Sequence, residues 1–141
     1  MIEAKVRKST FKHVESELFA YHDTRKEIIR LRNEILYPSR QQDDNIGGGR
    51  SGSTGDPTGR VVTALTANAR LQHMESIVHA IESVYERLPE EKKRLVNLYY
   101  WNRPQLLTWE GIAQKLHISR ITAIRWRDEV VYAISSNIGW R

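Results

Sequence analysis

The chain has 141 residues, a net charge of +5 and a pI near 9.6. It has no cysteine, which excludes disulfides, thiolate metal sites and cysteine nucleophiles, and no apolar run approaches the ~20 residues that span a bilayer. The basic balance favours an anionic partner such as nucleic acid. The excess is spread over the chain, with +2 in residues 1–60, +1 in 61–107 and +2 in 108–141, so charge alone does not locate a binding face.

Residues 1–37 predict a helical hairpin. Apolar residues recur at steps of three and four in two stretches, which predicts helices near 10–21 and 25–36 with a bend between them. Thr24 followed by Glu27 fits a capping box at the start of the second helix. Pro38 ends that helix, because proline disfavours helical backbone at the preceding Tyr37. The basic start of the chain lacks the apolar stretch of a secretory signal, so we expect a cytoplasmic protein.

A glycine-rich run, "NIGGGRSGSTGDPTGR", occupies residues 45–60. No window supplies the Gly-Lys-Ser or Gly-Lys-Thr of a phosphate-binding loop. A dinucleotide-binding loop follows a strand, and "YPSRQQDD" before this run is not one. The composition predicts that residues 38–60 form a flexible linker. The alternative is a segment that orders on meeting a partner, where Arg50 and Arg60 could touch a phosphate.

Residues 61–88 predict one long amphipathic helix. Its stripe steps by four and three over about six turns and must pack on something: Ala67, Leu71, Met74, Val78, Ile81, Tyr85 and Leu88. Two partners are open: the first helices of the same chain, or a second copy through a coiled-coil seam. Pro89, followed by two glutamates, then begins another helix. Its expected buried side is Leu95, Val96, Leu98 and Tyr99, and "WNRPQ" ends it.

Residues 106–134, "LLTWEGIAQKLHISRITAIRWRDEVVYAI", predict two helices joined by a tight turn. Thr108 fits the cap of the first helix, and Ser119 fits the cap of the second. The expected inner stripe of the second helix is Ala123, Trp126, Val130 and Ile134.

A helix-turn-helix has apolar residues at six positions counted here from Trp109, and the fifth position is small because the two backbones approach there. All six agree: Ile112, Ala113, Leu116, Ile118, Ala123 and Trp126. The ninth position is usually glycine, because the turn requires a positive φ. Here it is His117, one of the residue types that tolerate that conformation.

Docking geometry assigns roles to the outer side of the second helix, whose N-terminal part would enter the major groove. Arg120 and Arg125 can bind guanine O6 and N7 in a bidentate fork. Ile121 and Ile124 could pack on thymine methyls, although Ile124 could equally meet another helix. Phosphate contacts fall to two residues near helix starts and to one further arginine: Thr108, Thr122 and Arg127. The capping residue Ser119 is also counted among the expected DNA-binding residues. Asp128 also faces outward.

Residues 88–134 resemble region 4 of the bacterial sigma-70 factors: an "LP" start, an acidic and basic helix, an aromatic "YYW", then the two-helix reader. The order "RNEIL-YP", "DNIGGG", a long helix, "YYWN" and "LHISRITAIRWRDEV" is similar to the RinA family of phage transcriptional regulators, which is related to ArpU. This resemblance covers nearly the whole chain. It implies an activator of late or packaging genes in phages of Gram-positive bacteria.

We therefore predict an all-α protein with an N-terminal helical segment (1–37), a flexible linker (38–60), and a long helix followed by a sigma-70 region 4-like helix-turn-helix (61–141). The expected function is sequence-specific transcriptional activation by a dimer that binds double-stranded DNA at the host nucleoid, with host RNA polymerase as a further partner. The alternatives are a terminase small subunit-like packaging protein and a sigma-like module that binds polymerase. The five histidines form no metal-binding spacing and no nucleophile elbow is present, so we expect no enzyme, no cofactor and no metal.

Overall fold

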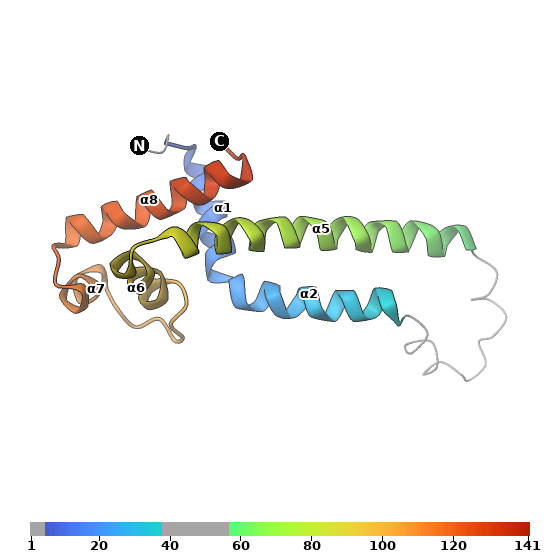
Figure 1. Cartoon of the computed structure of the whole chain (residues 1–141), viewed down its shortest axis with the longest axis horizontal. Helices are drawn as coiled ribbons and strands as arrows, with labels where there is room; N and C mark the ends of the chain where they lie inside the picture. The colour runs from blue at the N-terminus through green and yellow to red at the C-terminus, as the bar shows by residue number, and fades with distance from the viewer. Residues whose placement is uncertain (1–4, 38–56) are drawn as a thin grey trace. The chain divides into compact units, whose positions relative to one another are not determined.

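A computed structural model describes residues 5–37 and 57–141. Within these ranges the chain forms six helices and no strand, which confirms the all-α class (Figure 1). The helices are α1 (Lys8–Phe19), α2 (Tyr21–Leu36), α5 (Pro57–Arg87), α6 (Glu90–Tyr99), α7 (Trp109–Leu116) and α8 (Arg120–Ile138).

The break between α1 and α2 falls at Ala20, earlier than the sequence predicted. The predicted capping box is wrong, because Thr24 lies inside α2 and cannot cap its start. Tyr21 holds the break in place: it is buried, donates a hydrogen bond to Glu82 and stacks on Trp101 at 4.8 Å between ring centroids. This long-range anchor outweighs the local capping signal.

Helix α5 begins at Pro57, so the last four residues assigned to the linker are helical. Proline suits the first position of a helix, because its missing N–H has no partner there and its φ is already helical. The remainder of the predicted linker, residues 38–56, lies outside the described residues, and so do Arg50 and its predicted phosphate contact.

The described residues group into two compact units, and their division differs from the predicted one. The first contains residues up to His22 together with 77–141, and the second contains residues 23–76. The predicted N-terminal segment 1–37 is therefore divided between the two units, and so is the long helix α5.

In the first unit, α1 and the end of α5 share a core with α6 and α8. Val14 and Leu18 of α1 are fully buried, as are Ile81, Leu95 and Val130. Val78 and Ile81 of the predicted long stripe are buried within the chain, and so is the neighbouring Val84. This part of α5 therefore packs against other helices of the same chain, which is one of the two alternatives that the sequence left open.

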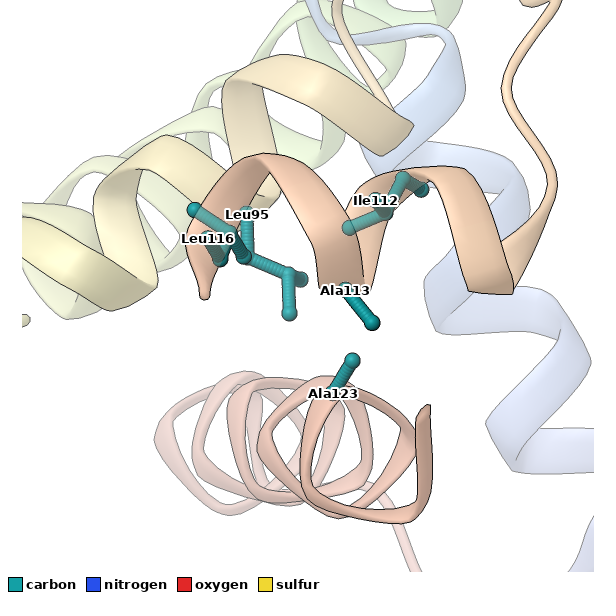
Figure 2. Packing of buried hydrophobic residues seen from close by; sticks show 5 residues of the cluster. All are labelled: Leu95, Ile112, Ala113, Leu116 and Ala123. Atoms are coloured by element: carbon teal, nitrogen blue, oxygen red, sulfur yellow. The ribbon is translucent and has the colours of Figure 1, made fainter. Parts of the chain in front are cut away.

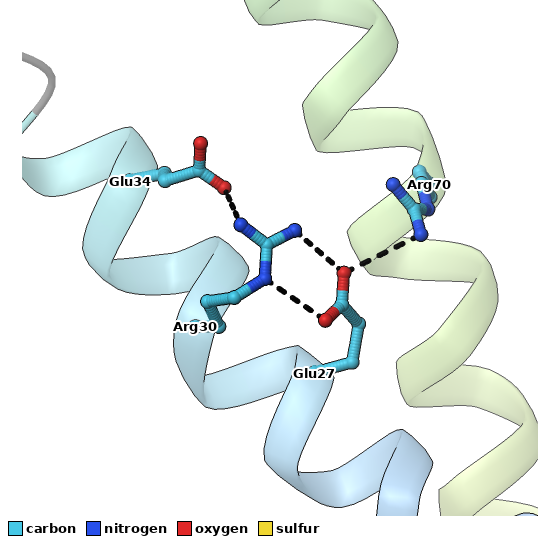
Figure 3. A network of polar contacts seen from close by, with 4 residues as sticks. All are labelled: Glu27, Arg30, Glu34 and Arg70. Carbon is cyan, nitrogen blue, oxygen red and sulfur yellow. Dashed lines mark hydrogen bonds and ion pairs between the residues drawn. The ribbon is translucent and has the colours of Figure 1, made fainter. Parts of the chain in front are cut away.

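In the second unit, ion pairs join α2 to the first part of α5. Arg30 lies between Glu27 at 2.7 Å and Glu34 at 2.5 Å on α2, and Arg70 of α5 lies 3.4 Å from the same Glu27 (Figure 3). The hydrogen bond from Arg30 lowers the pKa of the Glu27 carboxyl. Arg32 of α2 also pairs with Glu75 of α5. These pairs are exposed, so each contributes little to stability on its own.

Candidate nucleic-acid interface

The start of α7 is capped as predicted. Thr108 has extended backbone, and its Oγ1 accepts a hydrogen bond from the backbone N–H of Gly111 at 3.1 Å. Glu110 in the first turn adds a favourable charge at the positive end of the helix. The cap sets the residue at which α7 begins and therefore the direction of its inner face.

The turn between α7 and α8 consists of His117, Ile118 and Ser119. His117 adopts φ 58° and ψ 43°, the left-handed conformation that the pattern required at this position. The backbone N–H groups of His117 and Ile118 donate to the carbonyl groups of Gln114 and Ala113, which closes the end of α7. The Oγ of Ser119 then accepts from the N–H of Thr122 at 3.1 Å and caps α8, as predicted.

A small apolar core fixes the crossing of α7 and α8. Ala113 of α7 and Ala123 of α8 point toward one another, which explains why both positions are small (Figure 2). Leu95 of α6 completes this core together with Ile112 and Leu116. Trp109, Ile118 and Trp126 pack around it with partial burial. The prediction that Trp126 belongs to the core is confirmed.

The first two turns of α8 present an open outer face. The side chain of Arg120 is 53% exposed, Ile121 is 72% exposed, and Arg125 is also exposed. Ile124 and Thr122 are partly covered. Arg120 Nε lies 3.3 Å from Glu110 Oε2, but this pair is exposed and therefore weak. Both predicted guanine-reading arginines are thus accessible from solvent.

Arg127 points inward, and this disagrees with its predicted role at a phosphate. Its side chain is 17% exposed and lies 3.3 Å from Glu15 of α1 and 2.7 Å from Asp128. Its guanidinium carbon is 5.1 Å from the ring centroids of both Phe11 and Trp109. Asp128 is engaged in the same contact and its side chain is 33% exposed, whereas Arg127 is largely covered by protein. Helical position alone did not reveal this, because the partner Glu15 lies 112 residues earlier.

Glu15 also accepts a 2.6 Å hydrogen bond from the hydroxyl of Tyr100, which is buried. Burial, followed by the charge of Glu15, raises the pKa of the Tyr100 phenol well above its usual range. Burial acts to lower the pKa of Arg127, but the hydrogen bond to Asp128 and the nearby Tyr100 and Glu15 raise it overall. The network therefore keeps Tyr100 neutral and Arg127 charged where α1 meets α8.

Among the described residues, no group of His, Asp and Glu is arranged to hold a metal ion. Within the same ranges no helix is both long enough and apolar enough to cross a membrane.

The chain belongs to the family described as "Protein of unknown function (DUF722)", which matches residues 16–136. It is also a distant relative of the "Transcriptional activator rinA" of Staphylococcus phage phi11. The two are 28% identical over 131 residues, which cover 93% of this chain and 91% of the relative. No solved structure matches the chain. The predicted relation to RinA is supported over most of the chain, whereas the resemblance to sigma-70 region 4 stays a prediction.

Proposed function

We propose that this protein is a sequence-specific DNA-binding transcriptional activator of phage genes in a bacterial host. In this proposal α7 and α8 form a helix-turn-helix, and α8 enters the major groove. Two independent findings support it: the distant relationship to a phage transcriptional activator, and the capped two-helix geometry at residues 108–138. Late or packaging genes, which the family resemblance implies, are the proposed targets.

The observation that carries the proposal is the contrast between the two sides of α8. On the inner side, Ala123 and Val130 are buried in the core. On the outer side, the side chains of Arg120, Ile121 and Arg125 are exposed to solvent. Arginine can bind guanine with two parallel hydrogen bonds, and an apolar side chain can pack on a thymine methyl. Ile121 is 72% exposed, and contact with a base would remove its side chain from water.

The remaining predicted contacts take supporting roles. Thr108 and Thr122 lie at the starts of α7 and α8, where phosphates pass in this docking geometry. Ser119 sets the start of the reading helix through its cap. Ile124 is partly covered and would reach a base only at the edge of the interface. Arg127 pairs with Glu15 of α1 and with its neighbour Asp128, so we assign neither of them to DNA.

The test begins with selection of bound fragments from the phage genome, followed by salt-titrated binding to the selected site. We expect Arg120→Ala and Arg125→Ala each to weaken specific binding by about 1–3 kcal/mol, or about 5- to 150-fold in Kd, and to relax the preference at one base pair. Arg87→Ala is the matched control, because Arg87 is exposed at the end of α5 and borders a groove with Ser136 and Asn137 near the far end of α8.

Equal affinity of the parent protein for selected and random DNA contradicts the proposal, since nonspecific binding fits any basic protein. A double variant that has lost sequence preference but still activates the promoter points instead to a module that binds polymerase.

We further propose that the protein acts as a dimer through the second unit. Six of the nine large apolar side chains exposed in the described residues lie within it: Ile29, Leu36, Tyr37, Val61, Val62 and Leu65. A second copy presents the same apolar residues, as a two-fold interface requires.

Mass measurement in solution tests the dimer. We expect the parent protein to have twice the mass of one chain, and Val62→Glu with Leu65→Glu to reduce it to one chain, because burying two carboxylates in an apolar interface is unfavourable. Thr63→Glu with Ala64→Glu, at exposed positions on the other side of the same helix stretch, is the matched control. A parent monomer contradicts the proposal, and a ring of eight or more subunits favours a packaging protein that resembles a terminase small subunit.

A further inference from the structure

The start of α1 carries a cluster of basic side chains. Lys5, Arg7, Lys8 and Lys12 are exposed, and residues 5–14 contain no acid. None of these four side chains forms an ion pair or hydrogen bond with another described residue. The cluster does not stabilise the helix, because positive charge near a helix N-terminus opposes the helix dipole, and the first turn of α1 has no acidic residue to offset it.

The contacts of α1 show which way two of these lysines face. Phe11 and Glu15 lie on the side of α1 that meets Arg127. Lys8 is three residues before Phe11, and Lys12 is three residues before Glu15, so both lie along that same side of the helix. The opposite side is turned toward the end of α8: Thr10 donates a hydrogen bond to the carbonyl of Arg141, and His13 stacks on Trp140 at 4.3 Å between centroids.

Arg127 connects this side of α1 to the start of α7. Its guanidinium lies between the Phe11 and Trp109 rings, 5.1 Å from each centroid, and Trp109 is the first residue of α7. In a helix-turn-helix complex the first helix crosses the DNA backbone while the second enters the groove. In this docking geometry, a duplex that crosses the start of α7 and continues on this side would bring its next phosphates toward Lys8 and Lys12.

We propose that Lys8 and Lys12, with Lys5 and Arg7 preceding them, bind backbone phosphates of the DNA that α8 reads, so that α1 extends the DNA-binding surface beyond the two-helix reader. This inference rests on the proposed function and adds residues that the helix-turn-helix pattern does not include. Phosphate contacts of this kind set affinity and register and carry no sequence information. They also account for a basic cluster that opposes the stability of its own helix.

The first test is the salt dependence of DNA binding by the full-length protein. Log K falls as log salt rises, and each lost phosphate contact reduces the steepness of this fall by about 0.9. Lys8→Gln with Lys12→Gln is therefore expected to reduce the steepness by about 1.8 and to leave the base preference unchanged. Arg87→Gln removes one charge from an exposed position of the same unit, beside Ser136 and Asn137, and is expected to keep the parent slope. Loss of the two lysines removes unfavourable charge from a helix start, so the variant is expected to fold, as a thermal melt will check.

A second readout uses the absence of cysteine from the chain. An iron chelate that cleaves DNA, attached to Lys12→Cys, is expected to cut the backbone beside the selected site, whereas the same label on Arg87→Cys, in the same unit, gives no localised cut. A parent slope in the lysine variant, or no localised cut from position 12, overturns this inference even where the parent reads its site. Failure of the proposed function has a different signature, namely a parent protein with no sequence preference.

Discussion

Tyr100 and Arg127 meet at the carboxylate of Glu15, and this contact sits between α1, α6 and α8. Each group is partly or fully buried, so its charge state matters to folding. Arg127 is held by an ion pair and two aromatic rings, which gives it a structural role in positioning α8. The chemistry of this contact leads to a prediction about pH.

Because burial and the charge of Glu15 raise the pKa of Tyr100 in the folded protein, the folded state keeps the phenolic proton at a pH where the unfolded chain has lost it. The resulting stability is fully present below the ordinary value of 10.0 and is lost as pH rises above it. We expect the urea midpoint to fall steeply above pH 10. Tyr100→Phe should fall less steeply, although Tyr99, whose pKa burial also raises, retains part of the effect. Parallel curves for the two proteins would contradict this assignment.

At the scale of the elements, the geometry of the proposed DNA reader, α7 and α8, depends on two caps and one turn residue. Thr108 and Ser119 set where α7 and α8 begin, and His117 reverses the chain between them. A residue other than glycine in the left-handed conformation costs roughly 1–2 kcal/mol. The turn therefore carries a local cost that the packing of Ala113 against Ala123 offsets.

Substitution of His117 tests the cost of this turn. We expect His117→Gly to keep or slightly raise the thermal midpoint, because glycine adopts this conformation without steric strain. His117→Val should lower the free energy of unfolding by about 1–2 kcal/mol relative to the glycine variant, because a β-branched side chain is disfavoured at positive φ. Urea denaturation of the two variants measures the difference. Equal stability would show that the turn relaxes to another conformation.

At the scale of the whole molecule, the proposed DNA-binding surface and the proposed dimer surface lie in different compact units. The first unit contains the proposed reader and includes α1 from the far end of the chain. The second contains the exposed apolar residues that we assign to the dimer. Because the first unit is assembled from both ends of the sequence, its stability is expected to depend on α1.

Leu18 of α1 is 1% exposed, so Leu18→Ala is expected to cost about 2–5 kcal/mol of stability. Amide hydrogen exchange should show the loss of protection in α8 together with α1, because the two helices pack within one unit. Phe19→Ala, at a partly exposed position next to it, should cost less. Protection of α8 that is unaffected by Leu18→Ala would show that the reader is stable without α1.

Local signals in the sequence determined much of this protein. Caps depend on one side chain and the next few N–H groups, so Thr108 and Ser119 were predictable, and so was the unusual backbone at His117. Helical periodicity identified the inner face of α8 because its core neighbours in α6 and α7 are close in sequence. The start of α2 and the inward turn of Arg127 were not predictable in this way. Each depends on a partner from the far end of the chain, Glu82 and Trp101 for Tyr21 and Glu15 for Arg127.

Only the tertiary structure decided that α1 belongs with the reader and that the long helix α5 is divided between two units. The physical reason is that an amphipathic pattern indicates which face of a helix is apolar and must be buried. The pattern does not indicate which other helix covers that face. Val78 and Val84 continue the period that begins near Ala67, yet they are buried in the chain, while Val61, Val62 and Leu65 on the same helix remain exposed. That choice between partners depends on packing across the whole chain.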